Sequence, residues 1–280
     1  MSTIATLSHP IARVTADGTS RVDDTIAIEE PLEIRAVVGG AEHRVTVTMR
    51  TPGADAELAV GFLMAERIVS HASEVRAVRP CLTQSNLLRV ELVDDCASRV
   101  AGIARNFVAT SSCGLCGKTS LESVFASIPD ALEPNGPPIA GEALQQIPAR
   151  LRAAQAVFDR TGGLHAVAAF TFSGELAALY EDVGRHNAFD KLVGAAALAG
   201  GPDLTDCIVA LSGRAGFELV QKAAVARVPI VAAIGAPSSL AVELAERAGI
   251  TLVGFLRASG FNIYTHAGRV ALKTRSQAEV

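Results

Sequence analysis

The segment SSCGLCGK, residues 111–118, places two cysteines three positions apart among glycines and serines. Cys113 and Cys116 could exchange with a disulfide, supply half of a tetrahedral metal site, or carry a sulfur atom as a persulfide. The chain has five cysteines, an odd number, and its N-terminus lacks the basic and apolar regions of a secretory signal. We therefore expect free thiols in a cytoplasmic protein rather than structural disulfides.

The residues around this pair favour a nucleophilic thiol. A closed zinc site needs four ligands, but the sequence holds one CxxC pair and no closely spaced histidine pair, so we predict no metal site. Lys118 and an expected helix, whose start Thr119 and Glu122 mark by their capping-box spacing, should lower a thiol pKa. We predict that Cys113 is the primary nucleophile, and that Cys116 assists it or releases its sulfur by forming a disulfide. The residues alone leave a sulfur carrier and a dithiol oxidoreductase both open.

Apolar strands and helices alternate in the second half of the chain, over residues 149–280. The runs CIVALSG, PIVAAIG and ITLVGFLR are continuously apolar, as in parallel strands covered on both faces by helices, so we predict a three-layer α/β domain. The strands end in the turns LSGRAGFE, IGAPSSLA and GFLRASGFN, at the edge where open α/β sheets bind ligands. Glycines, helix N-termini and the guanidinium groups of Arg214 and Arg257 predict a nucleotide-like ligand with phosphates. No P-loop or dinucleotide fingerprint is present.

The segment YEDVGRHNAFDK, residues 180–191, is dense in polar side chains between two apolar elements. Polar groups beside buried elements are costly unless they are partnered. The segment therefore predicts either a capped, solvated loop or a set of partnered polar groups. His165 lies on an apolar strand, where a lone histidine is more often a core residue than a ligand. The sequence leaves the roles of His165, Asp182 and His186 open.

The first half of the chain has strand-like runs and one helix without regular alternation, which predicts a small α+β domain over residues 28–127. A hairpin with a Gly-Gly turn is expected over residues 31–50. We expect residues 1–27 to be a flexible arm and residues 128–148, with five of the twelve prolines, to be a linker. The net charge is −4 without a long basic run, and no apolar run approaches about 18 residues, so we expect neither nucleic-acid binding nor a membrane span.

Five strings in the chain together resemble one known family. They are SSCGLCGK, TGGLHAVAAF, YEDVGRHNAFDKLVG, SGRAGFELVQKAA, and GITLVGFLR followed by NIYTH. In this order they are similar to the FdhD family, the formate dehydrogenase accessory sulfurtransferases. The resemblance implies a persulfide on Cys113 and a second domain with the fold of cytidine deaminase. It implies a cofactor-binding segment at Phe255, Leu256, Arg257, Ala258, Ser259 and Gly260, to which we add Arg214 from the preceding turns.

The resemblance further implies a sulfurtransferase that takes sulfane sulfur from a cysteine desulfurase. The sulfur would pass to the bis(molybdopterin guanine dinucleotide) form of the molybdenum cofactor, bound as a substrate, for use in formate dehydrogenase. A homodimer is compatible with the family. Deamination is disfavoured because the His-x-Glu and Pro-Cys-x-x-Cys signatures are absent from residues 149–280. The alternatives are a cofactor-binding chaperone of formate dehydrogenase and a dithiol oxidoreductase.

Overall fold

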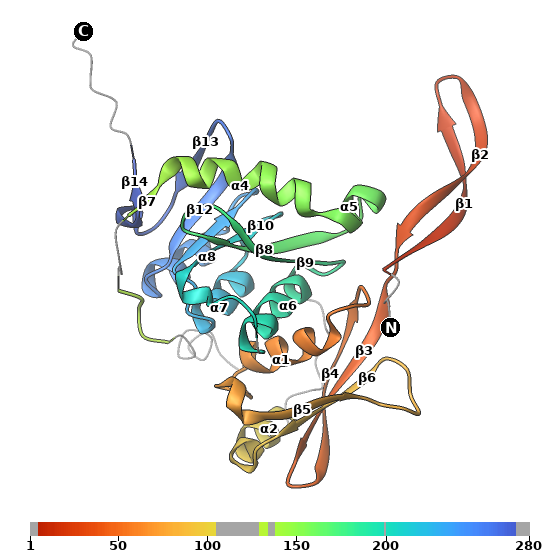
Figure 1. Cartoon of the computed structure of the whole chain (residues 1–280), viewed down its shortest axis with the longest axis vertical. Coiled ribbons are helices and arrows are strands. Elements are labelled where there is room, and N and C mark those ends of the chain that lie inside the picture. Colours follow the sequence, from red (N-terminus) through yellow and green to blue (C-terminus); the bar gives the residue numbers. More distant parts are fainter. Residues whose placement is uncertain (1–4, 105–128, 134–137, 199, 273–280) are drawn as a thin grey trace. The chain divides into compact units, whose positions relative to one another are not determined.

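The computed structural model describes residues 5–104, 129–133, 138–198 and 200–272 (Figure 1). Cys113 and Cys116 lie outside the described residues. The chain divides into two compact units, and each unit takes its residues from three separate stretches. Unit 1 lies within residues 1–119, 155–167 and 180–201, and unit 2 within residues 120–154, 168–179 and 202–280. No helix in the described part of the chain is long and apolar enough to cross a membrane.

Unit 1 begins with a β-hairpin, where we expected a flexible arm without regular structure. β1 (Thr6–Thr15) and β2 (Gly18–Ala27) pair antiparallel along their whole length. Aliphatic residues such as Leu7 and Ile26 face each other across the two strands. The strand signal was missed because Pro10 and many polar residues interrupt it, and because, in the part of the chain that the structure describes, no third strand joins the hairpin to make the alternation pronounced.

A four-stranded sheet with the order β4-β3-β6-β5 forms the centre of unit 1. Its strands are β3 (Glu30–Val38), β4 (Ala41–Arg50), β5 (Val75–Pro80) and β6 (Leu87–Leu92). β3 and β4 confirm the predicted hairpin, and Gly39 and Gly40 take φ values of 56° and 79° at its turn. Apolar side chains alternate along β3, with Leu32, Ile34 and Ala36 fully buried. Helices complete the unit: α1 (Asp55–Ala65), α2 (Ala97–Ala104), α5 (Ala156–Thr161), α6 (Arg185–Ala197) and the 3-10 turns η1 (Ala72–Glu74) and η2 (Asp94–Cys96).

Helices α1 and α6 of unit 1 approach each other through two glycines. A Cβ atom on Gly61 would lie 1.8 Å from the carbonyl oxygen of Asp190. A Cβ atom on Gly194 would lie 1.8 Å from the carbonyl oxygen of Glu57. Real Cβ atoms do not approach a backbone oxygen so closely, so the missing side chains allow the two backbones to touch.

A six-stranded sheet with the order β13-β12-β11-β10-β8-β9 organises unit 2. Its strands are β8 (His165–Thr171), β9 (Leu176–Asp182), β10 (Cys207–Leu211), β11 (Ile230–Ala233), β12 (Thr251–Arg257) and β13 (Gly260–Ile263). The first residues of β8 and the last residues of β9 belong to unit 1. β10, β11 and β12 are parallel neighbours joined by α7 (Phe217–Val225) and α8 (Ser239–Arg247), which confirms the predicted alternation. The likeness to cytidine deaminase stays a prediction.

The predicted linker over residues 128–148 differs from the observed structure. β7 (Ile139–Ala140) pairs with β14 (Val270–Ala271), and α4 (Gly141–Ala154) starts seven residues before the expected end of the linker. Side chains at helical spacing are buried along α4, namely Ala143, Leu144, Ile147 and Leu151. The prolines did not prevent a helix here, since Pro148 lies inside α4. α4 lies across the sheet of unit 2 in Figure 1, and the unit also contains the 3-10 turns η3 (Leu204–Asp206) and η4 (Ala267–Arg269).

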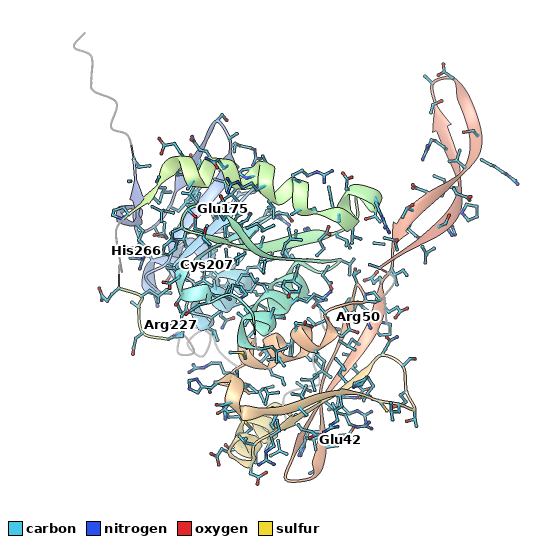
Figure 2. All side chains as sticks on the ribbon, viewed as in Figure 1. Glu42, Arg50, Glu175, Cys207, Arg227 and His266 are labelled. Carbon is cyan, nitrogen blue, oxygen red and sulfur yellow. The ribbon has the colours of Figure 1, made fainter. Side chains whose placement is uncertain are left out.

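The described residues around Leu132 are also held against unit 2. The Leu132 backbone N–H donates to the carbonyl oxygen of Ala248 at 2.9 Å, and Arg269 Nη2 donates to the Leu132 carbonyl oxygen at 2.9 Å. Arg227, labelled in Figure 2, donates to the carbonyl oxygen of Asp130 at 2.6 Å. This part of the proline-rich stretch is therefore a packed segment of unit 2.

Candidate ligand-binding site

Three segments at the carboxyl ends of β10, β11 and β12 form a connected set, which we call the edge loops. They are residues 212–216, 234–238 and 255–260. The Gly235 N–H donates to the carbonyl oxygen of Gly213 at 2.9 Å, and the Gly235 carbonyl oxygen accepts from the Phe255 N–H at 3.0 Å. The Ser238 N–H donates to the carbonyl oxygen of Ala215 at 3.0 Å. The edge loops are therefore one backbone-bonded platform, at the sheet edge where the sequence predicted a ligand.

Two glycines, Gly235 and Gly254, allow the backbones of the edge loops to approach one another closely. A Cβ atom on Gly235 would lie 3.0 Å from the carbonyl oxygen of Gly213 and 3.1 Å from Cγ of Arg214. A Cβ atom on Gly254 would lie 2.8 Å from Cδ of Pro237. The contacts at Gly254 are closer than real Cβ atoms show and those at Gly235 are tighter than most, so the two glycines serve close approach rather than flexibility.

The two arginines predicted to bind phosphate have different environments. Arg257 Nη1 donates to the carbonyl oxygens of Ile234 at 2.6 Å and Leu256 at 2.8 Å. Arg257 therefore ties the end of β11 to the end of β12. Arg214 is exposed, and within the described residues it forms no hydrogen bond or ion pair. Of the two side chains, Arg214 is the one whose whole guanidinium fork is open to an anion.

The helices that follow the edge loops also differ at their N-termini. The Ser238 hydroxyl caps α8 by accepting from the Ala241 N–H at 3.3 Å. The N-cap residue of α7 is Gly216, which has no side chain with which to cap. The α7 N-terminus thus has no capping side chain, but its first turn carries the acidic residue Glu218, so the positive group that this loop offers an anion is the Arg214 guanidinium.

The predicted cofactor-binding segment, residues 255–260, runs from the end of β12 through a turn into β13. Most of its members lie on the surface: Phe255, Arg257, Ala258 and Ser259 are exposed and Gly260 is half-buried. Leu256 is fully buried, so its side chain belongs to the core and a ligand would meet its backbone alone. Tyr264, directly after β13, is an exposed aromatic residue whose ring lies against Gly254 of β12, and the sequence patterns did not single it out. The signal that could have identified it is the tyrosine in NIYTH, directly after this segment.

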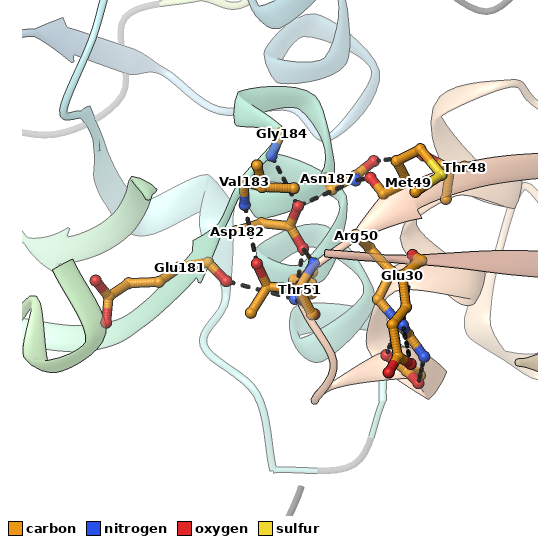
Figure 3. Close-up of polar contacts among 12 residues, drawn as sticks. Glu30, Thr48, Met49, Arg50, Thr51, Glu181, Asp182, Val183, Gly184 and Asn187 are labelled. Carbon is orange, nitrogen blue, oxygen red and sulfur yellow. Dashed lines mark hydrogen bonds and ion pairs between the residues drawn. The ribbon is translucent and has the colours of Figure 1, made fainter. Parts of the chain in front are cut away.

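The polar segment 180–191 is an internal network of unit 1 (Figure 3). Lys191 Nζ lies 2.7 Å from Asp182 Oδ2 and donates to the carbonyl oxygen of Thr51 at 2.9 Å. The Gly184 N–H and Asn187 Nδ2 donate to Asp182 Oδ1 at 2.8 and 3.1 Å. Asp182 and Lys191 are 0% and 2% exposed, and no buried side-chain nitrogen or oxygen in the described residues lacks a partner. The network therefore fixes the end of β4 to α6, and of the two alternatives the partnered one is confirmed.

Glu181 and His165 extend the partnered region. The Glu181 carboxylate accepts from the backbone N–H groups of Val157 at 2.9 Å and Phe158 at 2.7 Å, and so caps the start of α5. His165 is half-buried, and burial, together with the positive charges of Arg185 and His186, lowers its pKa. His165 is thus kept neutral near neutral pH, in line with the expectation of a core residue.

The described cysteines differ in reactivity. Burial raises the pKa of the Cys207 thiol to about 11 and also raises that of Cys96 (Figure 2). Cys81 is half-exposed; hydrogen bonding with Thr83 lowers its pKa to about 7, and Arg89 contributes in the same direction. Cys81 is therefore the most thiolate-rich of the described cysteines at neutral pH. The predicted pair, Cys113 and Cys116, stays a prediction.

Comparison with known proteins bears on the whole chain. The model of the FdhD/NarQ family matches residues 27–271. A protein of Nocardia farcinica named sulfur carrier protein FdhD is 46% identical over 96% of both chains, and one of Mycobacterium tuberculosis with the same name is 45% identical over 95% of this chain and 99% of its own. One of Sulfolobus acidocaldarius, also so named, is 42% identical over 89% of this chain and 92% of its own.

A solved structure agrees with the observed fold. It is the crystal structure of a protein from Desulfotalea psychrophila that was described as an accessory protein of formate dehydrogenase. The TM-score is 0.75, and the match covers 96% of this chain and all of the other at 21% identity. The family model and the near full-length relatives confirm the resemblance found in the sequence, and this chain belongs to the FdhD/NarQ family.

Proposed function

We propose that this protein is a sulfur carrier that delivers sulfane sulfur to the molybdenum cofactor of formate dehydrogenase. The observation that carries the proposal is near full-length similarity, at about 45% identity, to proteins named sulfur carrier protein FdhD. The edge loops support it independently, because the exposed Arg214 guanidinium suits the phosphates of a guanine dinucleotide pterin.

Cys113 is the proposed persulfide residue, and a cysteine desulfurase is the proposed donor. The Cys113 thiolate attacks the outer sulfur of the donor's persulfide. A new S–S bond forms at Cys113 while the donor's S–S bond breaks, and the donor leaves as a thiolate. Thiol–disulfide exchange follows the same course, so the step requires no external oxidant.

Cys116 is the proposed releasing residue. Its thiolate attacks the inner sulfur of the Cys113 persulfide, so that hydrosulfide leaves and a Cys113–Cys116 disulfide forms. The two thiols supply the two electrons that reduce the sulfane sulfur, and a cellular thiol reductant restores them afterwards. The hydrosulfide becomes a ligand of the molybdenum in the cofactor, which the edge loops hold as a substrate through Arg214 and residues 255–260.

Mass spectrometry of the intact protein tests the carrier step. After incubation with a cysteine desulfurase and cysteine, we expect a gain of one sulfur atom that maps to Cys113 and is lost in Cys113→Ala. Cys81→Ser is the matched control, because Cys81 is the half-exposed cysteine whose pKa is lowered to about 7. A sulfur atom found on Cys81, or retained in Cys113→Ala, would refute the assignment.

Maturation of formate dehydrogenase separates the carrier from a chaperone. Cys113→Ala should still bind the cofactor but should fail to activate the apo-dehydrogenase, with or without dithiothreitol. Cys116→Ala should form the persulfide and regain activity when dithiothreitol replaces the resolving thiol. Full activation by Cys113→Ala would instead identify a cofactor-binding chaperone.

A further inference from the structure

Exposed aromatic side chains are concentrated at the edge loops. Aromatic residues make up 4% of the chain, with two tyrosines and no tryptophan. Among the described residues, the exposed aromatic side chains are Phe255, at 46% exposure, and Tyr264, at 37%. Phe255 lies in the second half of β12 and Tyr264 directly follows β13, opposite Leu252 near the start of β12. The other described phenylalanines and Tyr180 are buried or half-buried. In the described part of the chain the exposed aromatic side chains thus lie beside one candidate site, which favours a ligand there.

The backbone around Tyr264 places its ring beside the edge loops. The Tyr264 N–H donates to the carbonyl oxygen of Leu252 at 2.8 Å, which fixes the residue opposite β12. A Cβ atom on Gly254 would lie 2.9 Å from Cε2 of Tyr264 and 2.8 Å from Cδ of Pro237. The ring therefore lies against the bare backbone of Gly254, next to the loop that follows β11. Its hydroxyl forms no hydrogen bond with any residue that the structure describes.

Phe255 has an unfavourable backbone conformation. Its φ is 52°, in the left-handed region that a bulky side chain rarely adopts. The hydrogen bond from the Phe255 N–H to the carbonyl oxygen of Gly235 at 3.0 Å holds this conformation. Strained residues of this kind cluster at functional sites, and here the strain leaves an apolar ring exposed.

Aromatic rings beside the edge loops, together with a guanidinium on those loops that has no partner among the described residues, match the two halves of a nucleotide. We propose that Tyr264 is the base-stacking residue of this site, with the purine of the ligand on the Tyr264 ring and its phosphates toward Arg214. This inference rests on the proposed function, in which the substrate carries guanine nucleotides. It adds a residue that lies outside the 255–260 segment, and it separates base binding from phosphate binding.

GDP carries both a base and phosphates, whereas inorganic pyrophosphate carries phosphates alone, so the two probes separate base binding from phosphate binding. Calorimetric titration of the full-length protein should show that Tyr264→Ala weakens GDP binding by about fivefold to a hundredfold, the range for loss of one stacked base. Tyr264→Ala should leave pyrophosphate affinity unchanged, and Tyr264→Phe, which keeps the ring, should bind GDP as tightly as the unaltered chain. Arg214→Ala should weaken both probes.

Tyrosine fluorescence gives a second readout, because the chain has two tyrosines and no tryptophan. In Tyr180→Phe the emission comes from Tyr264 alone, and bound GDP should quench it at saturation. Tyr264→Phe, which retains Tyr180, corrects for absorption of the exciting light by GDP. Equal apparent quenching in the two variants would contradict stacking on Tyr264.

The outcomes distinguish this inference from the proposed function. Unchanged GDP affinity in Tyr264→Ala, or equal losses for GDP and pyrophosphate, would overturn the stacking role alone. Failure of the unaltered chain to bind GDP would overturn both the stacking role and the cofactor-binding part of the proposed function. The persulfide on Cys113 would still be decided by mass spectrometry.

Discussion

The polar segment of unit 1 and the edge loops of unit 2 are both rich in polar and charged residues, yet their groups are partnered differently. In the first, Asp182 accepts three backbone or amide hydrogen bonds and pairs with Lys191 at 2.7 Å. In the second, the backbone groups bond to one another, while Arg214 and the Tyr264 hydroxyl have no partner among the described residues. Polar density alone therefore does not identify a ligand site, whereas an exposed charge without a partner among the described residues, such as that of Arg214, indicates one.

Solvation explains the difference. A charge taken out of water must be compensated by hydrogen bonds or an ion pair within the protein. The buried groups around Asp182 already make these interactions with one another and have none free for a ligand. An exposed guanidinium is solvated by water, which a phosphate can replace. The buried polar segment therefore contributes to the stability of the fold, and the exposed groups of the edge loops contribute to ligand binding. Variants of the two regions should therefore affect different measurements.

Lys191→Met should have the largest effect. It leaves the Asp182 carboxylate buried without its cation, which should lower the free energy of unfolding by about 3–5 kcal/mol. Urea denaturation measures the loss, and the double variant Asp182→Asn/Lys191→Met should recover part of it. Arg214→Met is the matched variant of the edge loops and should change stability by no more than about 0.5 kcal/mol. Similar losses of unfolding free energy in Lys191→Met and Arg214→Met would contradict the difference between the polar segment and the edge loops.

Gly194→Ala should come next, because α6 carries the polar network and Gly194 holds it against α1. The added Cβ would lie 1.8 Å from a carbonyl oxygen, so the helices must move apart at a cost of about 1–3 kcal/mol. Gly102→Ala in α2 is the control, because no atom of the described residues lies within 4 Å of a Cβ there and alanine favours helix. Thermal unfolding should show a lower Tm for the first variant alone.

Arg257→Ala sharpens the distinction between the two edge-loop arginines. Loss of its hydrogen bonds to Ile234 and Leu256 should lower the free energy of unfolding by about 1 kcal/mol. Arg214→Ala should leave stability unchanged and weaken pyrophosphate binding several-fold. Denaturation and calorimetry on both variants provide the check. A stable Arg257→Ala that loses all phosphate affinity would show that Arg257 contacts the ligand directly.

Glu74 should show the smallest effect, and it serves as a reference because its ion pair with Arg99 belongs to neither region. Hydrogen bonding with Arg99 lowers the pKa of Glu74 from 4.5 to about 2. Since the folded pKa is depressed, the contribution is present above pH 4.5 and is lost as the pH falls toward 2. Glu74→Gln should therefore cost about 0.5 kcal/mol near neutral pH and progressively less under acid conditions. If urea denaturation showed a difference in unfolding free energy between the unaltered chain and Glu74→Gln that does not vary with pH, the lowered pKa of Glu74 would be refuted.

Much of the secondary structure followed from local pattern. The Gly39-Gly40 hairpin and the alternating strands and helices from β10 to β12 were predictable because turn chemistry and apolar periodicity are local. The β1–β2 hairpin and the start of α4 were missed. In the hairpin, Pro10 and the many polar residues hid two strands that pair with each other. In α4, the prolines hid a helix that is stabilised by burial of its apolar face.

The sequence by itself determined the family, the CxxC pair and the glycine-rich turns, because these depend on residue identity and spacing. The tertiary structure decided which polar groups are partnered. It assigned Arg257 to carbonyl oxygens and left Arg214 open, placed Leu256 in the core, and brought Tyr264 to the edge loops. Partnering depends on which backbone and side-chain atoms the fold brings within hydrogen-bond distance, and spacing along one chain does not specify that.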